Sequence, residues 1–449
     1  MWGGFSGSRR RQDFMRHQRW SPAGWSAIVF VVLTTSLAGT DASIALGVKG
    51  RGNATPTIAA DGPFVAVAWG ATIESGATDV FVAVSRDAGR TFGGPVRVNN
   101  IEGDARLNGE QPPHVALVPA AGREPSIVVV WTTKGAKGTK LLQARSDDGG
   151  KSFSAGGLVP GTDAAGNRGW EAIAVEPAGR VDAVWLDHRE MAKDSSMAAS
   201  HHDHTGAGKP DGVAMAQQSK LFFASLDGSA APRAVTGGVC YCCKTALVGS
   251  AGGSIYAAWR HVYPGNLRDM AFTMSRDGGK TFAPPVRVSE DKWMLEGCPD
   301  DGPSMAVDSS RRIHIVWPTL VDGGAGAEPT IALFYAMSTD GIRFTARERV
   351  PTEGIPHHPR IALGAGGAVT VAWDESANGS RRIAVARGSV AADGRPRFQR
   401  TALTNGGSAI YPAIAVAGDA VVMAWTSGAS TTATIHVERL APPPAVTRR

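Results

Sequence analysis

The sequence predicts an all-β fold, a β-propeller of four-stranded blades, and three observations support this prediction. Glycine is abundant, with 56 residues, and charged residues make up only 19% of the chain, which is typical of a turn-rich, well-packed β protein. A unit of two alternating apolar strands ending in tryptophan recurs at intervals of roughly 50 to 75 residues, close to the length of a blade with its loops. A distinctive turn follows most of these tryptophans. The seven tryptophans are Trp69, Trp131, Trp185, Trp259, Trp317, Trp373 and Trp425.

The turn has a fixed pattern, Ser-x-Asp-x-Gly-x-Ser/Thr-Phe, with full copies at residues 85–92, 146–153 and 275–282. A fourth copy, at 338–344, is one residue short, and Asp227 and Asp393 mark degraded copies. In such a turn the Asp accepts hydrogen bonds from nearby backbone amides, the Gly takes a positive φ and the aromatic ring packs under the hairpin. Three full copies in register with the tryptophan repeat predict a regular series of blades.

These turns resemble the Asp boxes, or BNR repeats, of the sialidase superfamily, over nearly the whole chain after its N-terminal leader. The resemblance implies a β-propeller in which each Asp box joins the third and fourth strands of a blade and has a structural role. Sialidases have six blades, whereas this sequence has seven pairs of first and second strands. Residues 43–48 are placed to supply the missing last strand and so close the ring. We therefore expect seven blades, with six as the alternative.

The composition of the N-terminal residues indicates where the folded domain begins. A basic stretch through Arg19 precedes an apolar run from Trp25 to Leu37 and then small residues, which is typical of an export signal. The run is short for a bilayer span, which needs about 20 residues. We expect a signal peptide over 1–42 with cleavage between 38 and 45, a single propeller over 43–441 and a tail over 442–449. The protein is then periplasmic or secreted, and an uncleaved anchor is the alternative.

Charge and composition narrow the class of partner. The formal net charge is +6, but part of it lies in the leader, and no basic stripe interleaved with aromatic residues follows. Nucleic acid is therefore not an expected partner. We expect a monomer, without a stable membrane span, that binds a metal ion or an extracellular glycan or protein ligand.

The candidate site residues share one face. In a propeller, the loops from fourth to first strand and from second to third strand lie opposite the Asp boxes, and we call this side the loop face. All four cysteines are assigned to it, and the loop after Trp185 is unusually long, which suggests a function. The candidate metal ligands on these loops are Cys240, Cys242, Cys243, Cys298, His188, Met191, Met197, His201, His202 and His204.

Two interpretations of the cysteines compete, and a mixed arrangement of one disulfide plus a metal site is also open. An even number of cysteines in an exported chain favours disulfides, with Cys242 or Cys243 paired to Cys298. Thiolates with His and Met neighbours also suit copper or zinc, and the His/Met loop has a composition typical of metal capture, although solvated loops can share it. The chain also resembles an uncharacterised group of exported bacterial Asp-box proteins with the same Cys-x-Cys-Cys and Gly-Cys-Pro turns.

The sialidase resemblance implies a different chemistry: three arginines that hold a substrate carboxylate, a Tyr nucleophile activated by Glu, and an Asp acid/base. The family's Phe/Tyr-Arg-Ile-Pro sequence is absent near the first blade, and no nucleophile elbow or phosphate-binding loop appears. We therefore expect a binding protein with a copper or zinc site rather than an enzyme. An exo-sialidase-like glycoside hydrolase, or a protein- or glycan-binding propeller with structural disulfides, is the alternative. The residues assigned to a hydrolase are Tyr411, Glu171, Arg168, Arg260 and Arg360.

Overall fold

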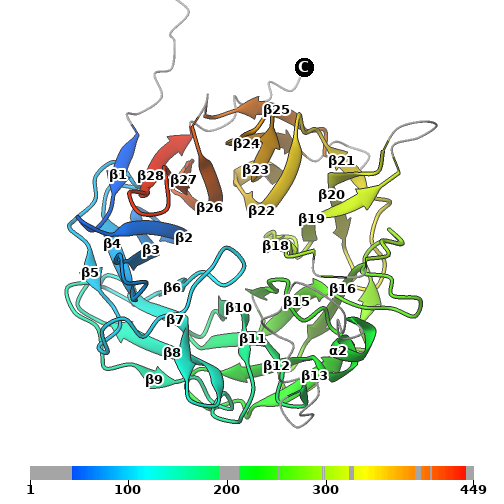
Figure 1. The fold of residues 1–449 in the computed structure, drawn as a ribbon, viewed down its shortest axis with the longest axis horizontal. Helices are drawn as coiled ribbons and strands as arrows, with labels where there is room; N and C mark the ends of the chain where they lie inside the picture. Colours follow the sequence, from blue (N-terminus) through cyan, green and yellow to red (C-terminus); the bar gives the residue numbers. More distant parts are fainter. Residues whose placement is uncertain are drawn as a thin grey trace, which may run out of the picture. The chain divides into compact units, whose positions relative to one another are not determined.

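The computed structural model describes residues 43–191, 212–250, 252–295, 297, 299–322, 328–389, 396–404 and 407–440. Within these ranges the strands form seven four-stranded antiparallel sheets, arranged as blades around one axis (Figure 1). The predicted all-β propeller with seven blades is confirmed. In the same ranges the helices are α2 (Gly212–Gln218) and the 3₁₀ turn η3 (Ala365–Gly367). Neither is long and apolar enough to span a bilayer.

Each of the first six blades uses four consecutive strands, with the first strand innermost (Figure 1). Blades 1 to 3 are β2 (Gly52–Asp61), β3 (Phe64–Thr72), β4 (Thr78–Ser85), β5 (Val96–Arg97); β6 (His114–Val118), β7 (Ser126–Gly135), β8 (Gly138–Ser146), β9 (Gly157–Leu158); and β10 (Arg168–Val175), β11 (Val181–Asp187), β12 (Lys220–Ser225), β13 (Arg233–Gly237). Blades 4 to 6 are β14 (Ala246–Ser250), β15 (Ser254–Arg260), β16 (Met270–Ser275), β17 (Val286–Arg287); β18 (Ser304–Val307), β19 (Ile313–Val321), β20 (Thr330–Ser338), β21 (Glu348–Val350); and β22 (Ile355–Leu363), β23 (Ala368–Ala377), β24 (Ser380–Ser389), β25 (Gln399–Ala402).

Blade 7 joins the two ends of the propeller. It consists of β26 (Ala409–Ala417), β27 (Ala420–Ser427), β28 (Thr434–Leu440) and, as its outer strand, β1 (Ile44–Leu46). Ile44 pairs with Val437 and Leu46 with Ile435. The prediction that an N-terminal strand closes the ring is therefore confirmed, and this pairing covers an edge that β28 would otherwise expose.

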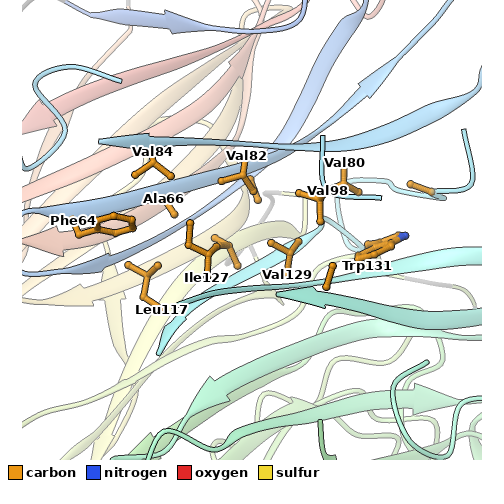
Figure 2. Close-up of a cluster of buried hydrophobic side chains, with 14 residues drawn as sticks. Phe64, Ala66, Val80, Val82, Val84, Val98, Leu117, Ile127, Val129 and Trp131 are labelled. Atoms are coloured by element: carbon orange, nitrogen blue, oxygen red, sulfur yellow. The ribbon is translucent and has the colours of Figure 1, made fainter. Parts of the chain in front are cut away.

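The core lies between the blades. All seven repeat tryptophans sit on second strands and are at most 4% exposed. Figure 2 shows one interface, where Val82 and Phe64 of blade 1 face Ile127 and Trp131 of blade 2. Successive residues of a strand point to opposite sides of the sheet, so each blade presents an apolar face to both of its neighbours. Truncating one of these tryptophans to alanine removes about 3–5 kcal/mol of stability.

The Ser–Asp turns adopt the hydrogen bonding that their sequence predicts. In the first, the Asp87 carboxylate accepts from the Arg90 and Thr91 backbone N–H groups at 3.0 and 2.8 Å, and the Ser85 hydroxyl accepts from Gly89 N–H at 2.9 Å. Gly89 has φ +82°. A Cβ added to Gly89 would lie only 3.0 Å from the Val422 side chain of blade 7. The turns thus tie each hairpin to the neighbouring blade on the face opposite the loops.

Candidate functional site

The inner strands are irregular where they reach the loop face. A β-bulge interrupts β2, β10, β22 and β26, and a non-glycine residue with positive φ lies in each bulge. Asp300, just before β18, has the same conformation. Backbone strain of this kind concentrates at functional sites, which directs attention to this end of the axis. The five residues are Thr55, Trp170, Asp300, His358 and Tyr411, with φ between 47° and 57°.

A network of buried charges connects blades that are not neighbours. Glu110, before blade 2, accepts hydrogen bonds from the Lys244 backbone N–H at 2.8 Å and from the Lys244 ammonium at 3.2 Å. Lys244 lies before blade 4, and its Nζ is 3.6 Å from Asp301, before blade 5. All three side chains are at most 4% exposed. Since blades 2 and 4 are separated by blade 3, their contact passes over the axis, toward which the loop between β5 and β6 extends (Figure 1).

The same network continues into blades 6 and 7. Asp301 accepts from the His358 backbone N–H at 3.1 Å, and the His358 Nδ1 lies 2.7 Å from Asp374. Asp374 also accepts from the Tyr411 N–H at 3.1 Å and from Arg381. Burial lowers the pKa of His358, but the Asp374 hydrogen bond and the surrounding carboxylates outweigh it and raise the pKa. We call Glu110, Lys244, Asp301, His358, Asp374 and Arg360 the axial cluster.

Two of the three arginines proposed for a hydrolase are occupied by the protein itself. Arg168 is fully buried, pairs with Asp187 at 3.1 Å and donates to the Ala164 carbonyl at 2.6 Å. Arg260 is 1% exposed and donates to the carbonyls of Asp301, Arg268 and Pro318. Both guanidinium groups brace loops rather than face a ligand.

Arg360 differs from these two. Its Nε donates to the Pro412 carbonyl at 3.3 Å, and no carboxylate in the described ranges forms an ion pair with it. Burial lowers its pKa, and the charges of Glu110 and Asp301 only partly oppose this. Nearby, the His114 Nε2 is buried without a hydrogen-bond partner among the described residues. Burial, then the charges of Arg360 and Lys244, lower the pKa of His114 to about 3, so the ring is neutral.

The remaining hydrolase candidates, Tyr411 and Glu171, make separate contacts. Tyr411 packs its ring edge-on against His358, with centroids 4.6 Å apart, and so close to Gly109 that a Cβ there would meet it at 2.1 Å. Glu171 lies between blades 2 and 3, with its carboxylate 3.4 Å from the Thr132 hydroxyl. Burial raises the pKa of Glu171 to about 7. In the described part of the chain the structure records no contact between Glu171 and Tyr411.

The cysteine-rich turn before β14 forms a compact group of sulfur atoms, which we call the cysteine cluster. The Sγ of Cys240 is 3.8 Å from those of both Cys242 and Cys243, and all three sulfurs lie within 4.8 Å of one another. All three residues are buried. Cys240 and Cys243 are free thiols, whereas Cys242 is in a disulfide and offers a thiolate only after reduction. Cys298 lies outside the described residues.

Two arginines, Arg268 and Arg260, act on the cysteine cluster through their positive charges. Arg268 Nη1 donates to the Cys240 Sγ at 3.1 Å, and its Nε donates to the Leu295 carbonyl at 2.9 Å, which fixes the guanidinium. The Cys243 thiol, then the charges of Arg268 and Arg260, lower the pKa of Cys240 to about 6. Burial raises the pKa of Cys243. Cys240 is thus the more acidic of the two free thiols.

The methionine and histidine candidates lie beside this cluster where the structure describes them. Met191 packs against Met215 of α2 and against Tyr241, while Ala216 of α2 packs on the three cysteines. The His188 ring is buried, 5.2 Å from that of Trp170, which also contacts the cysteine cluster. Met197, His201, His202 and His204 lie outside the described residues.

Sequence reasoning missed most of the axial cluster. Glu110, Lys244 and Asp374 received no assignment. Glu110 and Lys244 lie in the loops before β6 and β14, and Asp374 lies within β23. Met215 was also missed. A charged residue in an apolar strand is costly to bury unless it is paired, and for Asp374 this was the available signal.

No protein-family profile matches this sequence, and no curated protein is significantly similar to it. Among solved structures, the chain is similar to a polysaccharide lyase of family PL25, an ulvan lyase, with a TM-score of 0.54 and 9% identity over 88% of this chain and 94% of that chain. It is also similar to an α-L-arabinofuranosidase from Fusarium graminearum, with a TM-score of 0.48 and 12% identity over 90% and 98% of the two chains. An intramolecular trans-sialidase from Ruminococcus gnavus has a TM-score of 0.44 and 11% identity over 73% and 94%. At 9% identity the similarity to the lyase shows a shared fold alone, and the chemistry rests on this chain's own residues.

Proposed function

We propose that this protein is an exported binding propeller, as its leader predicts, that holds a soft metal ion in the cysteine cluster. The observation that carries the proposal is three buried sulfurs within 4.8 Å of one another. Thiolate ligands favour copper(I) and zinc. Thiolates bound to one metal at about 2.3 Å lie about 3.8 Å apart in a tetrahedral arrangement and about 4.0 Å apart in a trigonal one. The Sγ distances of 3.8 Å fit both without large rearrangement.

Charge balance and ligand number favour copper(I). Once the Cys242 disulfide is reduced, three thiolates around Cu⁺ would carry a net charge of −2, which the guanidinium groups of Arg260 and Arg268 would neutralise. Around Zn²⁺ the same set would leave an excess of positive charge. Within the described residues, no further histidine, cysteine or carboxylate joins the three sulfurs, whereas structural zinc requires a fourth ligand.

The His/Met loop is the proposed route of metal entry. Met191 and Met215 form a buried thioether pair next to Tyr241, and thioethers are soft ligands. In this proposal His188, Met191 and the loop residues Met197, His201, His202 and His204 capture the ion and pass it to the cysteines. The His and Met side chains bind the ion more weakly and so suit its transfer, whereas the cysteine thiolates suit its retention.

Metal titration tests the proposal. The full-length protein, fully reduced under anaerobic conditions, is titrated with copper(I) or zinc(II), desalted and assayed for metal. We expect retention of about one ion per chain, with absorbance from sulfur-to-copper charge transfer. Cys243→Ser should lose the retained ion, while His436→Gln, on blade 7, should behave like the wild type. A reduced protein that retains neither metal, or a Cys243→Ser variant with undiminished stoichiometry, contradicts the proposal.

A second candidate function is the binding of an acidic glycan at the axis, favoured by Arg360. The other cations there are paired: Lys244 with Glu110 and Asp301, and Arg381 with Asp374. Arg360 is left with donor capacity, and the neutral His114 donates in the tautomer that carries its proton on Nε2; a carboxylate accepts from both. Asp300 lies nearby, and burial, then the charge of Glu110, raise its pKa to about 6. A protonated Asp300 would repel such a ligand less at mildly acidic pH.

Calorimetric titration with a uronate oligosaccharide and with a sialoside tests this candidate. Binding should be lost in Arg360→Gln and kept in Arg343→Gln, an arginine exposed in a Ser–Asp turn. A fluorogenic sialoside assay distinguishes hydrolysis from binding, with Tyr411→Phe as the variant that should abolish turnover if Tyr411 is a nucleophile. No binding of either glycan eliminates this candidate.

A further inference from the structure

The two free thiols of the cysteine cluster are placed as a pair. Cys240 and Cys243 are separated by two residues in sequence, and their sulfurs are in contact at 3.8 Å. A disulfide requires about 2.05 Å between the sulfurs. An approach of about 1.8 Å is within the reach of side-chain rotation in a turn, because the two Cα atoms already belong to one tight segment.

The surroundings of the pair favour attack by one particular sulfur. Arg268 donates to Cys240 and is fixed in place by the Leu295 carbonyl. Cys243 instead donates its own proton toward Cys240. A thiolate beside a fixed guanidinium is the attacking group in thiol–disulfide exchange, and the protonated neighbour is the one that resolves the mixed disulfide.

The third sulfur shows that this turn accommodates oxidised sulfur. Cys242, between the two thiols in sequence, is already in a disulfide, 3.8 Å from Cys240. Oxidation of the remaining pair therefore leaves no thiolate among the three cysteines. Every ligand in the proposed metal site then depends on the redox state of the turn.

We infer that Cys240 and Cys243 form a reversible dithiol–disulfide couple whose oxidation closes the metal site. The couple stands by itself, and the gating rests on the function proposed above. The oxidant is a small-molecule or protein disulfide. The Cys240 thiolate attacks one sulfur of it, forms a mixed disulfide and releases the first thiolate, which takes up a proton. Cys243 then attacks the Cys240 sulfur, loses its proton and releases the second thiol. Two thiols and one disulfide thus become one internal disulfide and two released thiols.

The cover over the cysteines sets the speed of this exchange. Ala216 and Val213 of α2 pack on the cysteine cluster, and Cys240 and Cys243 are 1% and 2% exposed. An external disulfide reaches Cys240 only after local displacement of this seven-residue helix. Exchange with glutathione disulfide should therefore be slow in the native protein and fast in denaturant.

Redox titration tests the couple. The full-length protein is equilibrated in glutathione buffers of graded composition, quenched in acid, alkylated and mapped by mass spectrometry. We expect alkylation of Cys240 and Cys243 to disappear together, in a two-electron transition that yields a peptide linking them. In Cys243→Ser the resolving thiol is missing, so Cys240 should accumulate as the glutathione mixed disulfide. Arg268→Gln should slow the exchange.

Two outcomes overturn the couple: both thiols remaining alkylatable in fully oxidising buffer, or linkage of either to another cysteine at equilibrium. Metal retention measured on the same samples should fall from about one ion per chain to below about a tenth as the linked peptide appears. Equal retention by the oxidised protein refutes the gating and leaves the metal site intact. A couple that forms in a protein that never retains metal refutes the proposed function and leaves the couple intact.

Discussion

The axial cluster and the cysteine cluster lie on the same face of the propeller, yet their polar atoms are satisfied in opposite ways. In the axial cluster each buried carboxylate is matched: Glu110 by Lys244, and Asp374 by His358, Arg381 and a backbone amide. In the cysteine cluster the Cys240 sulfur contacts the other two sulfurs and Arg268, and Cys242 is in a disulfide. The first arrangement holds blades together across the axis. The second leaves the sulfurs of Cys240 and Cys243 as free thiols.

This difference distinguishes polar groups that stabilise the fold from polar groups that are available to bind a ligand. A buried charge that meets several protein partners is removed only at a large cost in stability, because its partners are then left unpaired in a medium of low polarity. A group whose remaining capacity faces a ligand can be removed at little cost to the fold and at a large cost to binding. The expected effects of substitutions in the two regions follow this rule.

Asp374→Asn should have the largest effect on stability. It breaks the ion pair between buried Asp374 and Arg381, whose side chain is 33% exposed, and weakens the acceptor for His358. A loss of about 3 kcal/mol in the free energy of unfolding is expected, the lower end for a buried pair. Denaturant titration measures it, with Glu124→Gln, in an exposed pair with Arg86, as the control. Metal retention by the folded variant should be unchanged. A loss below about 1 kcal/mol, or a parallel loss of metal, would show that the two regions are not distinct in this way.

Glu171→Gln tests a buried carboxyl that belongs to neither cluster. Burial raises the pKa of Glu171 to about 7, so the native state keeps a proton that the unfolded state loses above its ordinary pKa of 4.5. The wild type therefore loses stability as the pH rises from about 4.5 to 7, by up to about 3 kcal/mol. The neutral Gln variant lacks this loss, and its advantage over the wild type should grow between pH 5 and pH 8. Glu124→Gln is the control. Arg86 lowers the pKa of Glu124, so the stability difference between this variant and the wild type should change with pH in the opposite direction. A pH-independent difference between wild type and Glu171→Gln contradicts the assignment.

Arg360→Gln should have the smallest effect on stability. Its guanidinium donates one recorded hydrogen bond, to Pro412, and a loss of at most about 1 kcal/mol is expected. Arg260, which serves three carbonyls, is the matched comparison and should cost several times more when changed to Gln. Equal losses in thermal or denaturant unfolding would place Arg360 among the structural groups and remove the basis for an anion at the axis.

The fold was predictable because its signals are local and repeated. Trp69 and its six equivalents recur with the same strand pattern, and each Ser–Asp turn carries its own hydrogen bonds, so the sequence alone indicated seven blades and closure by residues 43–48. The cysteine cluster was also within reach, since Cys240, Cys242 and Cys243 are adjacent in the chain.

The axial cluster was not predictable, because its contacts join distant parts of the chain. Nothing in the sequence around Glu110 indicates that it meets Lys244, 134 positions later. Tyr411 precedes a proline, where local preference favours extended backbone, yet it has φ +57°. Arg168 and Arg260 lie at the first residue of β10 and the last residue of β15, but the choice between facing a ligand and facing backbone carbonyls is made by packing.

Closure by β1 has a consequence for how the protein is made. Because Ile44 pairs with Val437, the first strand of the described chain must wait for the last, β28, to be synthesised. The two strands are separated by roughly four hundred residues, and the entropy of closing so long a loop opposes the step. Until that pairing forms, the nascent chain carries an incomplete ring whose exposed edges can recruit strands from other chains. Three residues of β1 therefore determine the yield of soluble protein more than their small contact area suggests, and the ring becomes complete only after synthesis of the propeller has ended.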